Sequence, residues 1–291
     1  MAEKAARRTD WGGVARKGAS VLRPIPGADR GDAYAAGVPA RNEQRPEPLA
    51  DLERVSPEAG GPRRSGAQDA QRRRRPKVRL DVPQLDPASV RDMPKSERER
   101  LALRLRDAGE DFLAERFGDA LSTLRPLASR FAAVAEVQEL YGLTLYRLGR
   151  WTAAAHRLEQ YEAMTGAIDQ LPVLADCYRA LGRLNDVHDV WDRLRLSGPD
   201  AGTITEGRIV TAGALADEGR TQDAIRLLEA GPLRPKRPKE HHLRLWYALA
   251  DLYDQVGDLQ RARRGFSRVQ QAEPDFVDVN DRLASLNDAA S

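Results

Sequence analysis

The chain has 291 residues, with 47 Lys and Arg against 44 Asp and Glu and a formal net charge of +3. This length is enough for one or two domains with a buried core. A single cysteine, Cys177, excludes an intramolecular disulfide and a site built from several thiolates. No apolar run approaches the roughly 18 residues that span a bilayer, and no apolar stretch follows the charged N-terminus as in a signal peptide. We therefore expect a cytoplasmic protein with no membrane partner.

The first 80 residues differ in composition from the rest. They hold 18 Lys and Arg against 10 Asp and Glu, with eight prolines, nine glycines and two aromatic residues. The remaining 211 residues carry 29 Lys and Arg against 34 Asp and Glu. A segment of the first kind buries too little apolar surface to offset the entropy lost on ordering. We predict a disordered basic arm over residues 1–92 and a folded domain over residues 93–291.

Within the arm, residues 72–79 concentrate six cations: Arg72, Arg73, Arg74, Arg75, Lys77 and Arg79. Such a run favours contact with phosphates or with acidic protein, and no aromatic residue is interleaved for base stacking. Nucleic acid is therefore one candidate partner. The alternative is a solvated charge block, because Arg outnumbers Lys 41 to 6 in this chain, as codon bias in a GC-rich bacterial genome would produce.

From residue 93 the pattern is helical. Ser96 and Glu99, just after Pro94, have the spacing of a capping box. Apolar residues then recur at helical spacing: Leu101, Leu105, Ala108 and Phe112. No alternating strand pattern of useful length follows. Short Gly turns instead separate runs of about 12–15 residues, which is typical of helical hairpins.

An internal repeat follows from four turn glycines: Gly149, Gly182, Gly219 and Gly257. Seven residues before each turn is a small residue: Gly142, Ala175, Ala212 and Ala250. Four residues before it is a large one: Leu145, Tyr178, Leu215 and Tyr253. Five residues after each turn glycine is a smaller apolar residue: Ala154, Val187, Ala224 and Ala262. Nine residues after it is a bulky one: Leu158, Trp191, Leu228 and Phe266.

This pattern resembles the tetratricopeptide repeat, a helix–turn–helix unit of about 34 residues. An earlier unit is assigned without a turn glycine, on Gly109, Phe112, Phe117, Ala120, Leu124 and Leu127. The resemblance implies an all-α, right-handed α-solenoid of about five hairpins, closed by a C-terminal capping helix at about residues 276–286. It also implies a protein-binding scaffold or adaptor without catalysis.

Reactive side chains are sparse, so we expect no catalytic residue, metal site or cofactor. The four histidines, His156, His188, His241 and His242, lack the i,i+4 or Glu-x-x-His spacing that metal sites on helices use. Cys177 lies between apolar residues of a helix and is interpreted as a packing residue. Phosphate-loop and Gly-x-Ser-x-Gly patterns are absent from the chain.

The resemblance places the binding groove on the first helix of each unit. Polar and charged residues at the groove-facing positions comprise eight acids, three arginines and two tyrosines: Arg106, Glu110, Glu136, Glu139, Tyr146, Asp169, Asp176, Arg179, Glu206, Arg244, Tyr247, Asp251 and Asp254. The groove is therefore expected to be negative and to take a basic or neutral segment, with Tyr146 and Tyr247 as aromatic contacts. The alternative is that these acids only keep the groove soluble.

Chaperone-binding members of this family hold a C-terminal carboxylate with a clamp of Lys, Asn and Arg. The positions that match this clamp hold Arg106, Glu110 and Leu140, so only one cation is kept. We expect no recognition of acidic C-termini.

Several partners stay open at this point. The groove binds another protein, or it binds the chain's own arm through the cations of residues 72–79. Alternatively, the arm binds nucleic acid or the ribosome. A third alternative is self-association into a homodimer through imperfectly capped terminal units.

Overall fold

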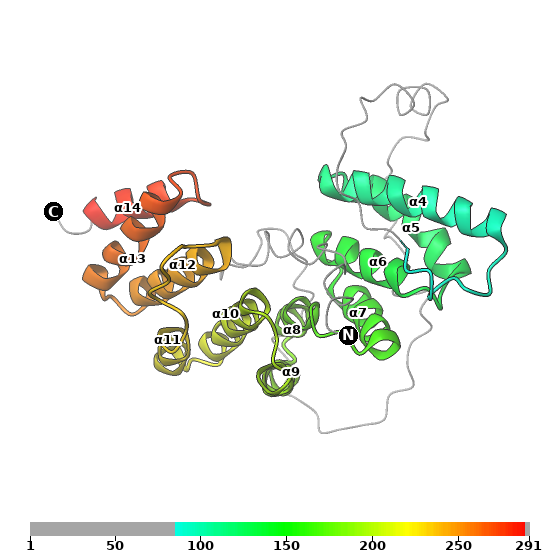
Figure 1. Cartoon of the computed structure of the whole chain (residues 1–291). Helices are drawn as coiled ribbons and strands as arrows, with labels where there is room; N and C mark the ends of the chain where they lie inside the picture. The colour runs from blue at the N-terminus through cyan, green and yellow to red at the C-terminus, as the bar shows by residue number, and fades with distance from the viewer. Residues whose placement is uncertain (1–84, 289–291) are drawn as a thin grey trace, which may run out of the picture.

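The computed structural model describes residues 85–288, and within them the protein is all-helical, as expected, with eleven helices and no strand (Figure 1). The helices are α4 (Lys95–Leu113), α5 (Phe117–Arg130), α6 (Ala135–Arg147), α7 (Trp151–Thr165), α8 (Leu171–Ala180), α9 (Leu184–Leu196), α10 (Ala201–Asp217), α11 (Thr221–Glu229), α12 (Glu240–Gln255), α13 (Leu259–Ala272) and α14 (Val279–Asp288). None of these helices combines the length and apolar character needed to cross a bilayer. The basic run of residues 72–79 lies outside the described residues.

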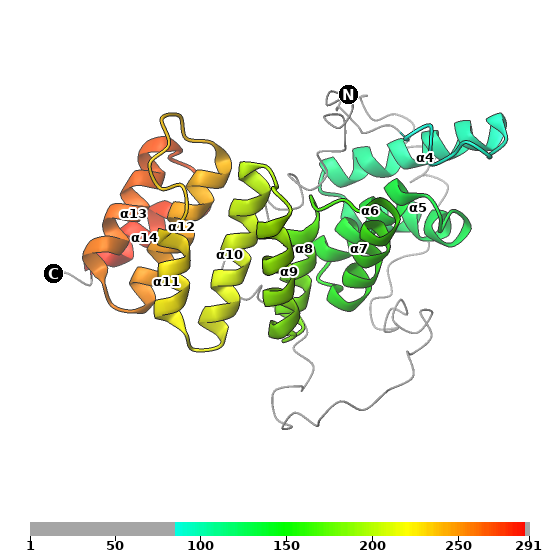
Figure 2. The same ribbon diagram turned by 60° about the horizontal axis from the view of Figure 1, so that its bottom comes forward.

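Successive helices pair as hairpins. The pairs α4–α5, α6–α7, α8–α9, α10–α11 and α12–α13 each pack along their length, and α14 packs on α13. The first helix of a hairpin also contacts the first helix of the next, from α4 to α6 and on through α8 and α10 to α12. Figure 2 shows the hairpins following one another across the molecule, from α4 at one end to α14 at the other.

The turn inside each hairpin has one geometry. Gly149, Gly182, Gly219 and Gly257 all have φ between 71° and 78°, the left-handed conformation that favours glycine. In the second hairpin the N–H of Arg150 donates to the carbonyl of Leu145 at 3.0 Å, which closes the end of α6. The equivalent bond recurs in the other hairpins, so the glycines are explained by the turn.

The first hairpin uses the same turn without glycine, and this corrects the assignment of its small residue. Glu115 takes the left-handed position with φ 57°, and the N–H of Arg116 donates to Asp111 at 2.8 Å. Seven residues before Glu115 is Ala108, which is fully buried. Ala108 therefore occupies the small position, not Gly109. The register of the first unit moves by one residue because a non-glycine residue accepts the left-handed conformation.

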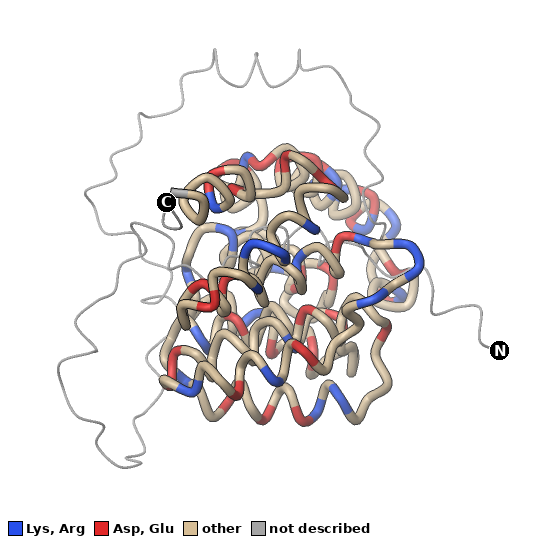
Figure 3. Tube along the Cα trace, turned by 90° about the vertical axis from the view of Figure 1, so that its left-hand side faces the viewer, with Lys and Arg blue, Asp and Glu red and all other residues tan. Residues whose placement is uncertain are grey.

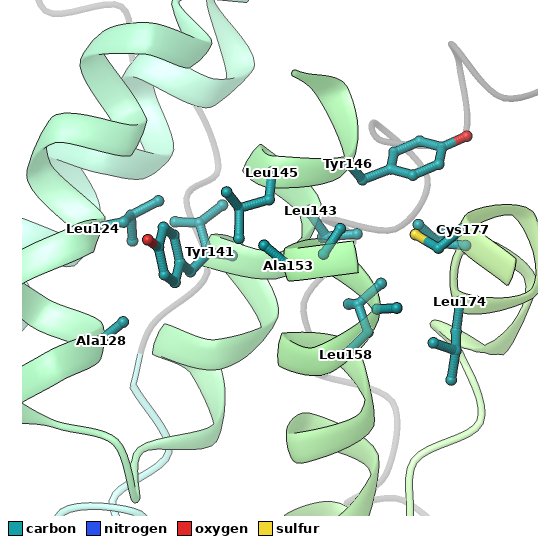
Figure 4. Close-up of a cluster of buried hydrophobic side chains, with 14 of the residues drawn as sticks. Leu124, Ala128, Tyr141, Leu143, Leu145, Tyr146, Ala153, Leu158, Leu174 and Cys177 are labelled. Atoms are coloured by element: carbon teal, nitrogen blue, oxygen red, sulfur yellow. The ribbon is translucent and has the colours of Figure 1, made fainter. Parts of the chain in front are cut away.

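The small residues let paired helices approach closely. A Cβ added to Gly142 would lie 2.9 Å from Cδ2 of Leu158 on α7, inside van der Waals contact. In the last hairpin a Cβ on Gly265 would lie 2.7 Å from that of Ala250. Figure 4 shows Leu143 and Leu145 of α6 and Leu158 of α7 in the buried core of the second hairpin.

The hydrophobic core forms two clusters that meet at α10. Val210 and Ala214 belong to the cluster of α4 to α9, whereas Ile209, Ala212 and Leu215 belong to that of α11 to α14. Different faces of α10 therefore pack into the two clusters. The expected C-terminal helix is present as α14, with Val279 and Leu286 buried.

Residues 85–92, which composition assigns to the arm, pack against the helices. Val90 is 2% exposed and belongs to the first cluster, and Leu85 and Met93 pack against it. The packed part of the chain therefore begins before residue 93.

Candidate protein-binding face

The residues expected to line the groove lie along the first helices of the hairpins, and we call this side the first-helix face. It is defined by the polar positions of α6, α8, α10 and α12 together with Asp169, which lies in the turn before α8. Figure 3 shows that acidic and basic residues alternate over the described helices, without one large region of a single sign. The contacts of each residue therefore decide what the face can bind.

Glu136, in the first turn of α6, receives the segment that precedes α4. Its Oε1 accepts the backbone N–H of Asp86 at 2.8 Å and the hydroxyl of Ser89 at 3.2 Å. Its Oε2 is buried and accepts no hydrogen bond in the described structure. The side chain of Val90, next to Ser89, is buried in the core. A predicted groove residue thus holds a non-helical stretch of this same chain.

The face between α6 and α8 is closed by two polar contacts. The hydroxyl of Tyr146 donates to Oδ2 of Asp176 at 2.6 Å, and Nε2 of Gln170 donates to Oε1 of Glu139 at 2.8 Å. Burial raises the pKa of Tyr146, and the adjacent Asp176 raises it further. Burial also raises the pKa of Asp176, against the opposing effect of Arg179. These groups join neighbouring hairpins.

Arg179 links α8 to α10. Its Nε lies 2.6 Å from Oδ2 of Asp217, and its NH1 lies 3.8 Å from Oδ1 of Asp176. A Cβ on Gly213 would come within 2.7 Å of the guanidinium carbon, so this glycine leaves room for the arginine to lie flat on α10. Asp217 keeps 42% of its side chain exposed. This end of the contact is open to solvent.

An enclosed ion pair joins α10 to α12. NH1 of Arg244 lies 3.2 Å from Oε2 of Glu206, and the two side chains are only 3% and 8% exposed. NH2 of Arg244 also lies 3.3 Å from Glu240, whose side chain is half exposed. Charges so enclosed are retained only when paired, so this contact fixes how α12 sits on α10.

The last contacts on the face join α12 to α14. Arg282 pairs with Asp251 and, at 2.9 Å, with Asp254. The hydroxyl of Tyr247 donates to Asp278. The two tyrosines expected to contact a ligand, Tyr146 and Tyr247, are therefore buried, and their hydroxyls are bound by Asp176 on α8 and by Asp278 just before α14.

Arg106 and Glu110 on α4 stand apart from this series. Their side chains lie 3.9 Å apart as an i,i+4 pair and are 49% and 36% exposed, and neither forms an ion pair with α6. The shifted register of the first hairpin explains this, because the equivalent positions on α4 are held by Leu105 and Gly109, which are both buried.

The sequence interpretation missed the partners of these residues: Gln170, Asp217, Asp278 and Arg282. Each partner lies about one repeat after the residue it contacts, with a separation of 38 residues for Asp217 and 31 for each of the other three. A search for complementary polar residues one repeat apart could have found them.

No catalytic or metal arrangement is apparent among residues 85–288. No group of three His, Cys, Asp and Glu side chains in this range could hold a metal ion. His188 lies 2.8 Å from Glu218, and burial raises the pKa of Cys177, which keeps its thiol protonated. A hollow of about 430 Å³ beside α12 is lined by Pro238, Lys239, Glu240, Leu243, Ala272, Glu273 and Phe276, and this lining holds no Ser, Thr, Cys or His. The absence of catalysis stays a prediction.

Comparison with protein-family models and with curated proteins finds no match for this chain. The functional conclusion therefore depends on the contacts described above.

Proposed function

We propose that this chain is a non-catalytic protein-binding scaffold of the tetratricopeptide type. In this proposal the five hairpins form a right-handed α-solenoid, and the first-helix face holds an extended segment of basic or neutral character. The segment comes from another protein or from the chain's own arm. The repeated left-handed turn, the close approach at Gly142 and Ala250, and the contacts between successive first helices support this geometry.

The single observation that carries the proposal is the segment held by Glu136. Residues 85–92 are non-helical and form turns. Hydrogen bonds to the ligand backbone, together with a pocket for an apolar side chain, are how many scaffolds hold peptides. Here Glu136 accepts from Asp86 and Ser89, and Val90 is buried next to them. The first-helix face can therefore take a non-helical chain at this end. A ligand that displaces the segment gains both oxygens of Glu136.

The charge of the face favours a basic or neutral ligand. Asp217 and Asp254 keep part of their side chains exposed, whereas the arginines of the face are committed to ion pairs. An acidic segment would meet carboxylates before it met a free cation. A basic segment would be attracted, and this attraction would fall with salt.

The arm is one candidate for this ligand. Seven residues separate Arg79 from Asp86, and a flexible stretch of that length has an r.m.s. span of about 13–16 Å. In this proposal the tether would raise the effective concentration of residues 72–79 at the face toward the millimolar range. An external partner would displace them.

A peptide selection on the full chain tests the proposal. Phage-displayed random 12-residue peptides are selected on the wild-type chain, and the enriched peptides are measured by fluorescence anisotropy. We expect enrichment of Lys and Arg over Asp and Glu, and a loss of affinity of about fivefold or more in Glu136→Gln, because one charge-assisted contact is worth about 1 kcal/mol or more. Asp189→Asn, an exposed acid on the second helix α9, is the matched control and leaves affinity unchanged.

Two results would count against the scaffold proposal. One is that no peptide binds saturably. The other is that the selected peptides are acidic or bind equally well to Glu136→Gln and to the wild-type chain.

A further inference from the structure

The loop between α11 and α12 is the most basic exposed feature of the described structure. Residues 231–239 contain four cations, Arg234, Lys236, Arg237 and Lys239, and no acid. All four are exposed. Figure 2 shows this loop projecting beyond the end of α12. It lies on hairpins four and five, away from Glu136 in the second hairpin.

The loop backbone is held in place. Nε1 of Trp246 donates to the carbonyl of Leu233 at 3.1 Å, and a Cβ on Gly231 would lie 2.8 Å from Leu245, so the start of the loop rests on α12. Three prolines, at positions 232, 235 and 238, fix φ along the loop. The cations are therefore displayed from a fixed backbone, which lowers the entropy lost on binding.

Arg268 on α13 extends the basic surface. Its guanidinium carbon lies 3.7 Å from the centre of the Trp246 ring. Burial lowers its pKa, and the charge of Arg234 lowers it further, so two cations face one another here. Arg264 lies one turn earlier on α13 and is exposed. We call these six cations, Arg234, Lys236, Arg237, Lys239, Arg264 and Arg268, the loop patch.

The loop patch differs from the arginines at the hairpin turns because its clustered cations form no ion pair. At the hairpin turns, Arg183, Arg220 and Arg261 each lie within 2.9 Å of an aspartate three residues away. Over the described residues no cation of the loop patch forms an ion pair with a carboxylate, although Arg268 stacks on Trp246 and Arg264 lies near enough to Asp258 to lower the pKa of that carboxyl. Two acids, Glu240 and Glu273, line the hollow beside Lys239. Glu240 is paired with Arg244, so of these two acids only Glu273 is left as a nearby negative charge for Lys239. Like charges held together without counter-ions repel, and a polyanion relieves that repulsion.

We propose that the loop patch binds the phosphate backbone of nucleic acid. The chemistry of the loop favours this ligand over an acidic protein. Three prolines remove backbone N–H donors, and the carbonyl of Leu233 is already used by Trp246, so little backbone is left to pair with a peptide. Phosphates need only the side-chain cations. Trp246 is 4% exposed and offers no stacking surface, so binding is independent of base sequence.

Fluorescence anisotropy with a labelled 25-nucleotide single strand tests the loop patch on the full chain. The test variant carries Arg234→Gln, Lys236→Gln and Arg237→Gln. The matched control carries Arg100→Gln, Arg104→Gln and Arg125→Gln, three exposed arginines of α4 and α5 without ion pairs. Circular dichroism confirms that both are folded. A third variant replaces Arg72, Arg73, Arg74 and Arg75 by Gln, which separates the arm from the loop.

We expect the loop variant to lose affinity by about tenfold or more near 100 mM salt, and its salt slope to fall by about 2, because each phosphate contact on a single strand contributes about 0.7. The control should change by less than threefold. RNA and DNA of the same length should bind alike, since only phosphates are contacted.

Four results would overturn the assignment. The loop variant binds within twofold of the wild-type chain; loop and control variants lose affinity equally; RNA and DNA differ by more than tenfold; or poly-glutamate displaces the oligonucleotide at equal charge concentration, which would make the surface a site for acidic protein.

Discussion

Arg244→Met tests whether polar contacts on the first-helix face hold neighbouring hairpins together. Met keeps an unbranched apolar stem and removes the charge that faces Glu206 across 3.2 Å, in a site where both side chains are less than one-tenth exposed. Removing one partner of such a buried pair typically costs about 3–5 kcal/mol, because the remaining charge stays desolvated. We expect a loss near the lower end, about 3 kcal/mol, measured by urea unfolding followed by circular dichroism.

The double variant Glu206→Gln with Arg244→Met completes this test. Removing both charges takes away the desolvated carboxylate, so the double variant should be more stable than Arg244→Met alone. Arg226→Met is the control, because Arg226 is 68% exposed and pairs only with Asp223 on the surface, where a loss of at most about 0.5 kcal/mol is expected. The reasoning is refuted if Arg244→Met costs less than about 1 kcal/mol, or if the double variant is less stable than the single one.

Three further predictions concern the hairpins and their titrating groups. In urea unfolding, Gly142→Ala should destabilise the chain by about 1–3 kcal/mol, because the added Cβ would lie 2.9 Å from Leu158. The control Gly118→Ala, whose Cβ would have no atom within 4 Å, should be neutral or stabilising by up to about 1 kcal/mol. Burial lowers the pKa of His242 below its ordinary value, so the unfolded chain binds a proton more readily. Stability should therefore fall as pH drops through about 6.5 toward 5, and His242→Gln should flatten this dependence; an unchanged profile would refute the assignment. Burial and the neighbouring carboxylate of Glu229 raise the pKa of Tyr253 to about 12. In an absorbance titration, Tyr253→Phe should therefore remove a phenol that ionises well above pH 10. Loss of a phenol that ionises near pH 10 would contradict this prediction.

The hairpin pattern could be predicted from sequence because its determinants are local. A left-handed turn selects glycine, and a close helix crossing selects a small residue seven positions earlier, as Gly149 and Gly142 show. The first hairpin was misplaced by one residue because Glu115 adopts the left-handed conformation that the pattern assigns to glycine. Composition likewise assigned residues 85–92 to the arm, since Val90 gives no sign of burial in so polar a stretch.

The polar residues of the first-helix face could be located but not interpreted from spacing. Helical periodicity places Asp176 and Glu206 on that side of their helices, but it does not say whether a carboxylate faces solvent or the next helix. Tyr146 and Arg244, one repeat away, turn these acids into contacts between hairpins. Glu136 differs because the element beside it is a non-helical segment, which no repeat pattern describes.

Hydrogen exchange of the full chain, with and without a selected basic peptide, tests most directly whether the first-helix face is a peptide-binding surface. The N–H of Asp86 is donated to Glu136 in the structure. If a ligand replaces this segment, amides of residues 85–90 should exchange faster when peptide is added, while those of α6 exchange more slowly and those of the second helices α7 and α9 do not change. Unchanged exchange in residues 85–90 together with protection confined to the second helices would contradict the proposal.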